Sequence, residues 1–309
     1  MAESSRESPT AGNGVAQACA AWDEPGAVFA RCGLASLDDL ETREWRALLS
    51  RLERAQEEFR RRLPAFRSPA YRWPSDPLHR ATRVWEYPYV LGNLLAWQSA
   101  HSGPHPLTVV DLGSGVTFLP FALAAEGFRV IAVDRDAVCA VEFERAIPLF
   151  PTAAGRLSFE LADACALPFE EGTVDAVVCV SVLEHVQDLA GALREVCRVL
   201  SPTGVFLLTV DLDLTGTGRL GPHEYAVLQE ALSRLFSPLW PETVTHPSRL
   251  LTSDTSPWGY RGMATTRRAL IAARDALCRC LPPLWGKREK VSVATYGACF
   301  QPRRVLDEC

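Results

Sequence analysis

The 309-residue sequence predicts an α/β fold in which a mostly parallel sheet carries helices on both faces. Short apolar, β-branched runs alternate with amphipathic segments of helical length over residues 107–210. The links between these segments are short, as in consecutive strand–helix–strand units. The first strand ends in a glycine turn and the second ends in a carboxylate. Because ligands bind at the carboxyl ends of parallel strands, these observations predict a ligand site at that edge of the sheet.

The predicted elements follow the chain in regular order. Apolar runs predict strands at residues 107–112, 129–133, 156–161, 176–180, 205–210 and 291–300. Core-facing periodicity predicts helices at residues 37–63, 84–98, 117–126, 137–149, 189–200, 222–236 and 265–280. The last strand is expected to pair antiparallel with a strand near 238–246, at the edge of the sheet.

The N-terminal third differs from the rest in composition. Residues 1–20 are small and polar and predict a disordered tail, 21–105 predict an N-terminal helical cap, and 106–309 predict the main domain. Aromatic residues are dense in the cap, where they either wall a pocket or pin the helices to the core. Arg60-Arg61-Arg62 is interpreted as a solvated, basic helix end, with a phosphate-binding patch as the alternative.

The composition of the chain argues against several classes of function. A net charge of −5 gives no reason to expect a nucleic-acid partner. No run of 18 apolar residues predicts a membrane span, and the N-terminus has no apolar signal core, so a cytoplasmic protein is expected. The ten cysteines form no C-x-x-C pair and indicate reduced thiols, with a zinc site as the minority interpretation.

The glycine turn carries the strongest chemical signal. Gly113 and Gly115 let the backbone turn sharply and approach a ligand, and Asp134 follows at the distance where a carboxylate binds ribose hydroxyls. A dinucleotide fingerprint requires a third glycine where Phe118 stands. Asp111 is an odd neighbour for a diphosphate and suits a ligand with a positively charged amino group. The turn therefore predicts a nucleoside ligand that is not a dinucleotide.

The string Asp111-Leu-Gly113-Ser-Gly115 resembles the first motif of class I S-adenosylmethionine-dependent methyltransferases, with Thr117 where the family often has a third glycine. Asp163-Ala164, Leu167-Pro168-Phe169 and Glu184-His185 follow in the family's order. The resemblance covers about residues 107–212. It implies a Rossmann-like, mostly parallel seven-stranded sheet and S-adenosyl-L-methionine as cofactor, with 106–309 as the domain that binds it.

The resemblance also implies roles for individual residues. Gly113 and Gly115 are assigned to the methionine portion of the cofactor, Asp134 to its ribose, and Asp163 with Ala164 to its adenine. The expected cofactor-binding residues are Asp111, Gly113, Ser114, Gly115, Asp134, Arg135, Asp163, Ala164 and Ser181. Some relatives acting on quinone precursors bind a metal through Glu-x-x-Glu-His; Ser181 replaces the first glutamate here, so no metal is expected.

The expected reaction is methyl transfer to an oxygen or nitrogen atom of a small molecule. A hydroxyl acceptor needs a base at hydrogen-bond distance, and the candidates are His185 and His223. The alternatives are an NAD-dependent dehydrogenase on a Rossmann sheet, a methyltransferase of RNA or protein, and a scaffold that binds partners without catalysis. The sequence does not indicate the acceptor or the oligomeric state.

Overall fold

The computed structural model describes residues 29–71, 77–101, 103, 105–215, 220–258 and 292–303. Five strands lie side by side and run parallel, as the sequence predicts. In spatial order they are β4 (Leu157–Leu161), β3 (Arg129–Asp134), β2 (Thr108–Leu112), β5 (Val174–Val180) and β6 (Leu200–Asp213). Starting from β2, the chain first adds strands on one side and then, from β5 on, adds them on the other side. An open α/β sheet forms its ligand crevice at such a point, here between β2 and β5.

The antiparallel edge is larger than predicted, so the described residues form a sheet of nine strands and not seven. The ten-residue β9 (Val293–Pro302) pairs antiparallel with β6 along its inner edge. Its outer edge takes two short strands end to end, β7 (Phe236–Pro238) at one end and β1 (Cys32–Leu34) at the other. The strand β8 (Glu242–Thr243), in the region predicted to pair with β9, pairs with β1 instead. Neither β7 nor β1, with three residues each, is long enough to cover the ten-residue β9 alone.

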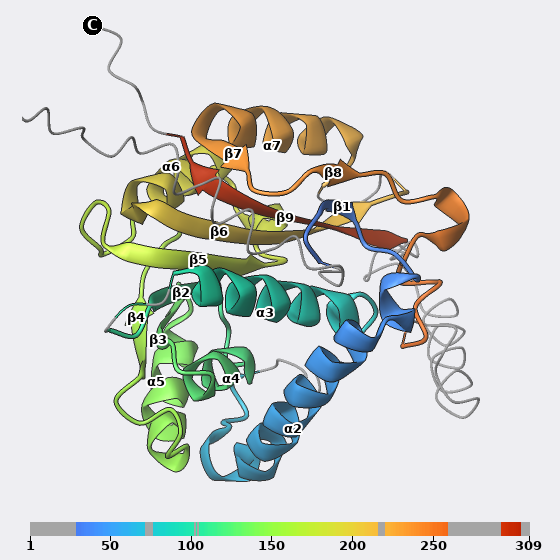
Figure 1. Cartoon of the computed structure of the whole chain (residues 1–309). Coiled ribbons are helices and arrows are strands. Elements are labelled where there is room, and N and C mark those ends of the chain that lie inside the picture. Colours follow the sequence, from blue (N-terminus) through green and yellow to red (C-terminus); the bar gives the residue numbers. More distant parts are fainter. Residues whose placement is uncertain are drawn as a thin grey trace, which may run out of the picture.

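Helices cover both faces of the sheet (Figure 1). One face carries α2 (Arg43–Phe66), α3 (Arg83–Ala100), α4 (Leu119–Ala125) and α5 (Ala137–Ala146). The other face carries α6 (Leu189–Val199) and α7 (Pro222–Leu235). Short 3-10 turns are η1 (Asp39–Glu41), η2 (Ile147–Leu149), η3 (Leu183–His185) and η4 (Pro247–Arg249). Successive side chains of a strand point to opposite faces of the sheet. Val109 therefore packs in the hydrophobic core on the face with α2 to α5, and Val110 packs in the core on the face with α6 and α7.

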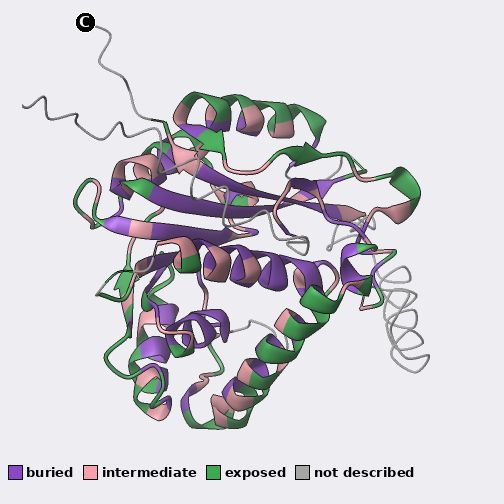
Figure 2. Ribbon diagram, viewed as in Figure 1, coloured by how far each residue is buried: buried purple, intermediate pink, exposed green. Residues whose placement is uncertain are grey.

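The N-terminal segment is part of the same hydrophobic core as the sheet. Trp85 and Tyr89 of α3 are fully buried, stack with ring centroids 4.5 Å apart, and pack onto β9. A Cβ atom on Gly297 would lie 2.6 Å from the Trp85 ring, so glycine is required for this close approach. Figure 2 shows α3 as a largely buried helix against the sheet. The predicted boundary between a cap and a main domain remains a prediction.

The long N-terminal helix begins and ends later than predicted. Thr42 is its N-cap and accepts a hydrogen bond from the Trp45 amide, which places the start at Arg43 and leaves the preceding residues in η1. Its end at Phe66 means that Arg60-Arg61-Arg62 does not lie in the last turn, so the expected basic helix end is wrong. Arg60 and Arg62 instead pair with Glu57 and Glu58 on the same helix. These pairs favour a solvated face over the alternative of a phosphate patch.

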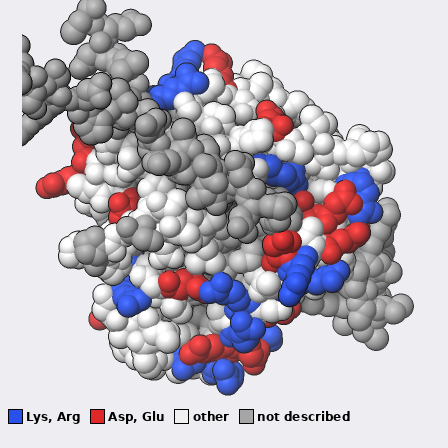
Figure 3. Space-filling model, in the orientation of Figure 1, with Lys and Arg blue, Asp and Glu red and all other residues white. Residues whose placement is uncertain are grey.

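The charge pattern of the surface is mixed. On the face in Figure 3, acidic and basic side chains lie next to one another. Within the described residues, no helix has both the length and the apolar character needed to cross a membrane. The predicted disordered tail at 1–20 and the predicted helix at 265–280 lie outside the described part of the chain.

Candidate functional site

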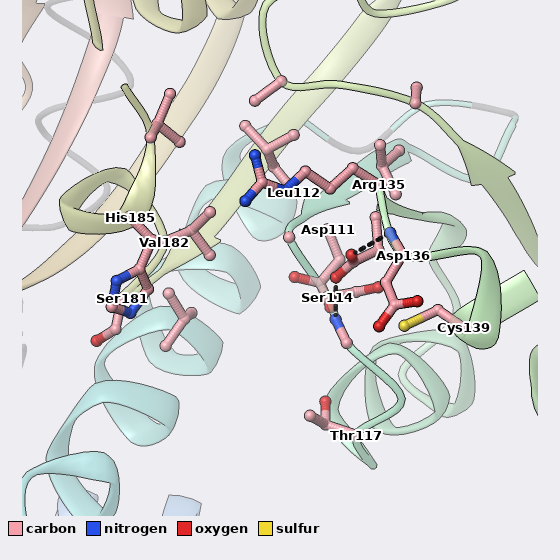
Figure 4. Close-up of a pocket in the computed structure, with 18 of the residues that line it drawn as sticks. Asp111, Leu112, Ser114, Thr117, Arg135, Asp136, Cys139, Ser181, Val182 and His185 are labelled. Carbon is pink, nitrogen blue, oxygen red and sulfur yellow. Dashed lines mark hydrogen bonds between the residues drawn. The ribbon is translucent and has the colours of Figure 1, made fainter. Parts of the chain in front are cut away.

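A cavity of about 560 Å³ opens at the carboxyl ends of β2, β3, β4 and β5. Its wall contains ten of the eleven residues expected to bind a cofactor or act as a base. They are Asp111, Gly113, Ser114, Gly115, Asp134, Arg135, Asp163, Ala164, Ser181 and His185. In Figure 4, Ser181, Val182 and His185 face Asp111, Ser114 and Asp136 across the pocket. The cavity therefore brings together predicted site residues that are up to 74 positions apart in the sequence.

The glycine loop after β2 is confined on two sides. Gly113 has φ +67°, and a Cβ atom there would lie 2.5 Å from Cγ1 of Val182. Gly115 has φ +47°, and its Cβ atom would lie 2.7 Å from the Tyr71 hydroxyl oxygen. Both positions need glycine for conformation and for space. At Gly113 and Gly115 the loop therefore presents backbone without a side chain.

Two aromatic residues of the N-terminal segment support this loop. The Tyr71 hydroxyl accepts a hydrogen bond from the Val116 amide at 2.5 Å, and Arg67 donates to the Val116 carbonyl at 3.0 Å. Tyr87 packs edge-to-face on the fully buried ring of Phe118, with centroids 5.4 Å apart. Sequence reasoning left open whether such aromatics wall the pocket or fill the core. Tyr71 and Tyr87 line the cavity, whereas Trp85 and Tyr89 are core.

Asp111 is a buried carboxylate without a partner for one oxygen. It is 3% exposed, and its Oδ2 atom has no hydrogen-bond partner within the described residues. Burial, with a smaller contribution from Asp134, raises the pKa of Asp111 to about 8. An unsatisfied buried carboxylate is costly, and a ligand ammonium group would relieve that cost. This environment fits the charged amino group that the sequence motif predicts.

Asp134 and Asp163 are oriented by backbone amides. Asp134 Oδ2 accepts from the Gly115 amide and Oδ1 from the Asp136 amide, both at 2.9 Å, so the carboxylate is fixed at the tip of β3. Each oxygen keeps a lone pair for a ligand hydroxyl. Asp163 Oδ1 accepts from the Cys165 amide at 2.9 Å and shapes the turn after β4. A vicinal diol and an exocyclic amine are the groups that such carboxylates can bind.

Ser181 closes the cavity at the tip of β5 in a strained conformation. Its φ is +50°, which is uncommon for a residue with a side chain. Its hydroxyl donates to Glu86 Oε1 at 2.5 Å and accepts from Arg83. Arg83 also pairs with Glu86, and Arg83 lines the cavity. The sequence reasoning did not identify Arg83 or Glu86. The sequence feature that could have indicated these two residues is the i, i+3 spacing of their opposite charges at the start of a predicted helix.

The two histidines have different positions. His185 lies on η3, directly after β5, and its exposed side chain lines the cavity. His223 lies exposed in the first turn of α7 and is not part of the cavity wall. Glu184 on the same turn as His185 accepts from the Asp211 amide at 3.4 Å. Burial and the nearby Asp211 raise the pKa of Glu184 to about 8. Among the described residues, no group of three or more histidine, cysteine or acidic side chains is arranged to hold a metal ion.

Comparisons with known proteins agree with this geometry. Residues 110–208 match the family model of the methyltransferase domain. The chain is 37% identical over 122 residues to a ubiquinone/menaquinone biosynthesis C-methyltransferase of Methylobacterium nodulans, covering 36% of this chain and 47% of that protein. It is 30% identical over 157 residues to a ubiquinone biosynthesis O-methyltransferase of Xanthomonas axonopodis, covering 48% and 60%.

Similarity to solved structures extends further along the chain but is weaker. A putative sarcosine dimethylglycine methyltransferase from Galdieria sulphuraria is 16% identical, with a TM-score of 0.46 and coverage of 71% of this chain and 87% of that chain. In sequence, the chain spans about half the length of the curated relatives it matches. Residues 110–208, which supply most of the cavity wall, match the methyltransferase-domain family model, as the predicted class I methyltransferase core requires.

Proposed function

We propose that this protein is an S-adenosyl-L-methionine-dependent methyltransferase that methylates an oxygen or nitrogen atom of a small molecule. The observation that carries the proposal is the cavity wall. It combines a glycine loop that presents bare backbone at Gly113 and Gly115, a buried carboxylate at Asp111 whose Oδ2 atom has no partner within the described residues, and fixed carboxylates at Asp134 and Asp163. These groups complement a ligand with an ammonium group, a ribose and an adenine.

The residues divide the cofactor among three strand ends. Asp111 and the loop from Gly113 to Gly115 would hold the methionine portion, and Asp134 the ribose hydroxyls. Asp163 and Ala164 would hold the adenine. Arg135 and Ser181 would complete the cavity wall around the cofactor. When bound, the cofactor supplies an electrophilic methyl group on a sulfonium, and the protein supplies alignment and a dry site.

His185 is the proposed base for a hydroxyl acceptor. It lies at the carboxyl end of β5, on the cavity wall opposite Asp111. An acceptor hydroxyl within hydrogen-bond distance of the imidazole would lose its proton to a ring nitrogen as its oxygen attacks the methyl group. His223 lies outside the wall, so we propose no role for it. The matched relatives include a C-methyltransferase and an O-methyltransferase, so they do not indicate which kind of atom accepts the methyl group.

Calorimetry with the purified chain tests the cofactor. We expect saturable binding of S-adenosylmethionine and no binding of NAD. Asp134→Ala should weaken the complex by at least about tenfold, because a carboxylate bonded to hydroxyl groups is lost. The matched control is Glu144→Gln, which removes an exposed carboxylate of α5 outside the cavity wall and should leave the affinity unchanged. Binding of NAD in place of S-adenosylmethionine would favour the dehydrogenase alternative.

A further inference from the structure

Residues 67–71, here called the strap, run from the end of α2 to the glycine loop of the cavity. The strap begins directly after Phe66, the last residue of α2, whose ring is buried in the hydrophobic core. Pro69 and Ala70 form an exposed turn in its middle. Tyr71, at the other end, lines the cavity. The strap is therefore fixed at its start, exposed in its middle and part of the cavity wall at its end.

The strap pairs with the backbone of Val116, the buried residue that follows Gly115. The Val116 amide donates to the Tyr71 hydroxyl at 2.5 Å, and the Val116 carbonyl accepts from Nη2 of Arg67 at 3.0 Å. The Arg67 guanidinium also lies over the Tyr71 ring, with its central carbon 4.3 Å from the ring centroid. Because buried backbone groups need partners, the shape of the loop at Gly115 and Val116 depends on the strap being in place.

Glu142 anchors the strap to α5. Its side chain is fully buried and lies outside the cavity wall. Its Oε1 atom accepts a hydrogen bond from the Ser68 amide at 2.6 Å, and its Oε2 atom lies 3.7 Å from Nε of Arg67. A carboxylate on α5 therefore holds the first two residues of the strap without lining the cavity itself.

The charged groups that hold the strap are incompletely paired. Nη1 of Arg67 and Oε2 of Glu142 are buried, and neither has a hydrogen-bond partner within the described residues. The 3.7 Å between Nε and Oε2 is an ion-pair distance that is too long for a hydrogen bond. Buried charged groups with unfilled hydrogen-bonding capacity are costly. Water that reached this pair when the strap opened would therefore offset part of the free energy lost with the strap's contacts.

We propose that the strap is a gate of the cofactor cavity and that Glu142 is the positioning residue that holds it closed. This inference rests on the proposed function, because the gated ligands are S-adenosylmethionine and its demethylated product. Opening removes Tyr71 from the cavity wall and frees the Val116 peptide groups, so the ligand can leave or enter. Closing restores the glycine loop around the ligand. The fraction of time that the strap is open then sets both the association rate and the dissociation rate.

Surface plasmon resonance of S-adenosylhomocysteine on the immobilised full chain measures both rate constants. Glu142→Gln removes the charge that attracts Arg67 and weakens the acceptor of the Ser68 amide, and it leaves the cavity wall unchanged. The matched control is Glu144→Gln, an exposed carboxylate two residues later on α5 and outside the wall. Tyr71→Phe is the second test variant, because it removes the hydrogen bond to Val116 and keeps the ring.

We expect Glu142→Gln to raise both rate constants about 5- to 20-fold, with an equilibrium affinity within about threefold of the wild type, as for the weakening of one charge-assisted hydrogen bond. Glu144→Gln should match the wild type. Faster dissociation without faster association would overturn the gate, since a damaged or fixed wall does not admit the ligand faster; unchanged rates would overturn it too. If Glu142→Gln does not fold, Tyr71→Phe must show the same joint rise. Failure of the wild-type chain to bind S-adenosylhomocysteine would instead refute the proposed function.

Discussion

The glycine loop allows a prediction in which conformation and space can be measured separately. Gly113→Ala adds a methyl group at φ +67°, where it would lie 2.5 and 2.6 Å from the two γ carbons of Val182. Gly155 has a similar φ of +73°, and nothing lies within 4 Å of a Cβ atom there. The two substitutions therefore share the cost of the left-handed backbone, and only the first creates a clash.

The magnitudes follow from these distances. A left-handed residue with a side chain costs roughly 1–2 kcal/mol relative to glycine, and both variants lose this amount. Carbon atoms pack at about 3.5–4 Å, so at Gly113 the neighbours must separate by roughly 1 Å. Overpacking of this kind costs about 1–3 kcal/mol. We expect Gly155→Ala to lose about 1–2 kcal/mol of unfolding free energy and Gly113→Ala about 2–5 kcal/mol.

Chemical denaturation of the wild type and both variants measures these values, and calorimetry measures cofactor affinity. Gly113→Ala should also weaken S-adenosylmethionine binding, because Val182 and the loop line the cavity, whereas Gly155→Ala should not. Combining Gly113→Ala with Val182→Ala removes both γ carbons and leaves only the Cβ atom of residue 182, at 3.1 Å, so it should recover most of the clash cost after correction for Val182→Ala alone. Equal losses for the two single variants would refute the reasoning, since the clash would then have no energetic consequence.

Three further predictions concern the charged and titratable groups of the cavity. Asp111 has a folded-state pKa of about 8, above its unfolded value, so ammonium binding requires loss of a proton below pH 8. Affinity for S-adenosylmethionine should rise by about 20-fold from pH 6 to 7.5, and Asp111→Asn should bind weakly with a flat profile; a flat wild-type profile would contradict the assignment. Because the carboxyl ionises at its ordinary pKa in the unfolded chain, whereas the folded Asp111 stays protonated up to about pH 8, the ligand-free protein should lose stability as pH rises through that interval, and Asp111→Asn should be more stable than the wild type in denaturation there. For a hydroxyl acceptor, His185→Gln should lower kcat by about 10²–10⁴-fold with cofactor affinity within twofold; retained kcat in a steady-state assay would remove His185 as the base.

The matched core shows which features local chemistry can predict. Strands β2 to β6 are found near their expected positions, because apolar runs between glycine turns have few alternatives to buried strands. The acids at strand ends lie together because the carboxyl ends of parallel strands meet at one edge of the sheet. The antiparallel edge was harder to predict. The pairing of β9 with β7 and β1 depends on a 2- or 3-residue register with distant segments, which leaves no periodic signal.

The candidate site divides in the same way. Asp111, Gly113, Gly115 and Asp134 belong to one continuous stretch, so their order and spacing alone predicted a nucleoside site. Their conformations, including the confinement of Gly113 by Val182, depend on residues nearly 70 positions away. The sequence also could not separate Tyr71 and Tyr87, on the cavity wall, from the core aromatics nearby. For Tyr87 that choice depends on which face of α3 meets the sheet, and for Tyr71 it depends on the path of the chain after α2.

The sequence alone predicts the class of fold and the proposed nucleoside ligand, because glycine turns, buried strands and terminal acids act through local geometry. Only the tertiary structure decided that His185 lines the cavity and His223 does not, since both follow strands of the same sheet edge. It alone placed Arg83 against Ser181, which lies 98 residues later. Such contacts form only when α3 packs on β9, and no pattern within either segment encodes that packing.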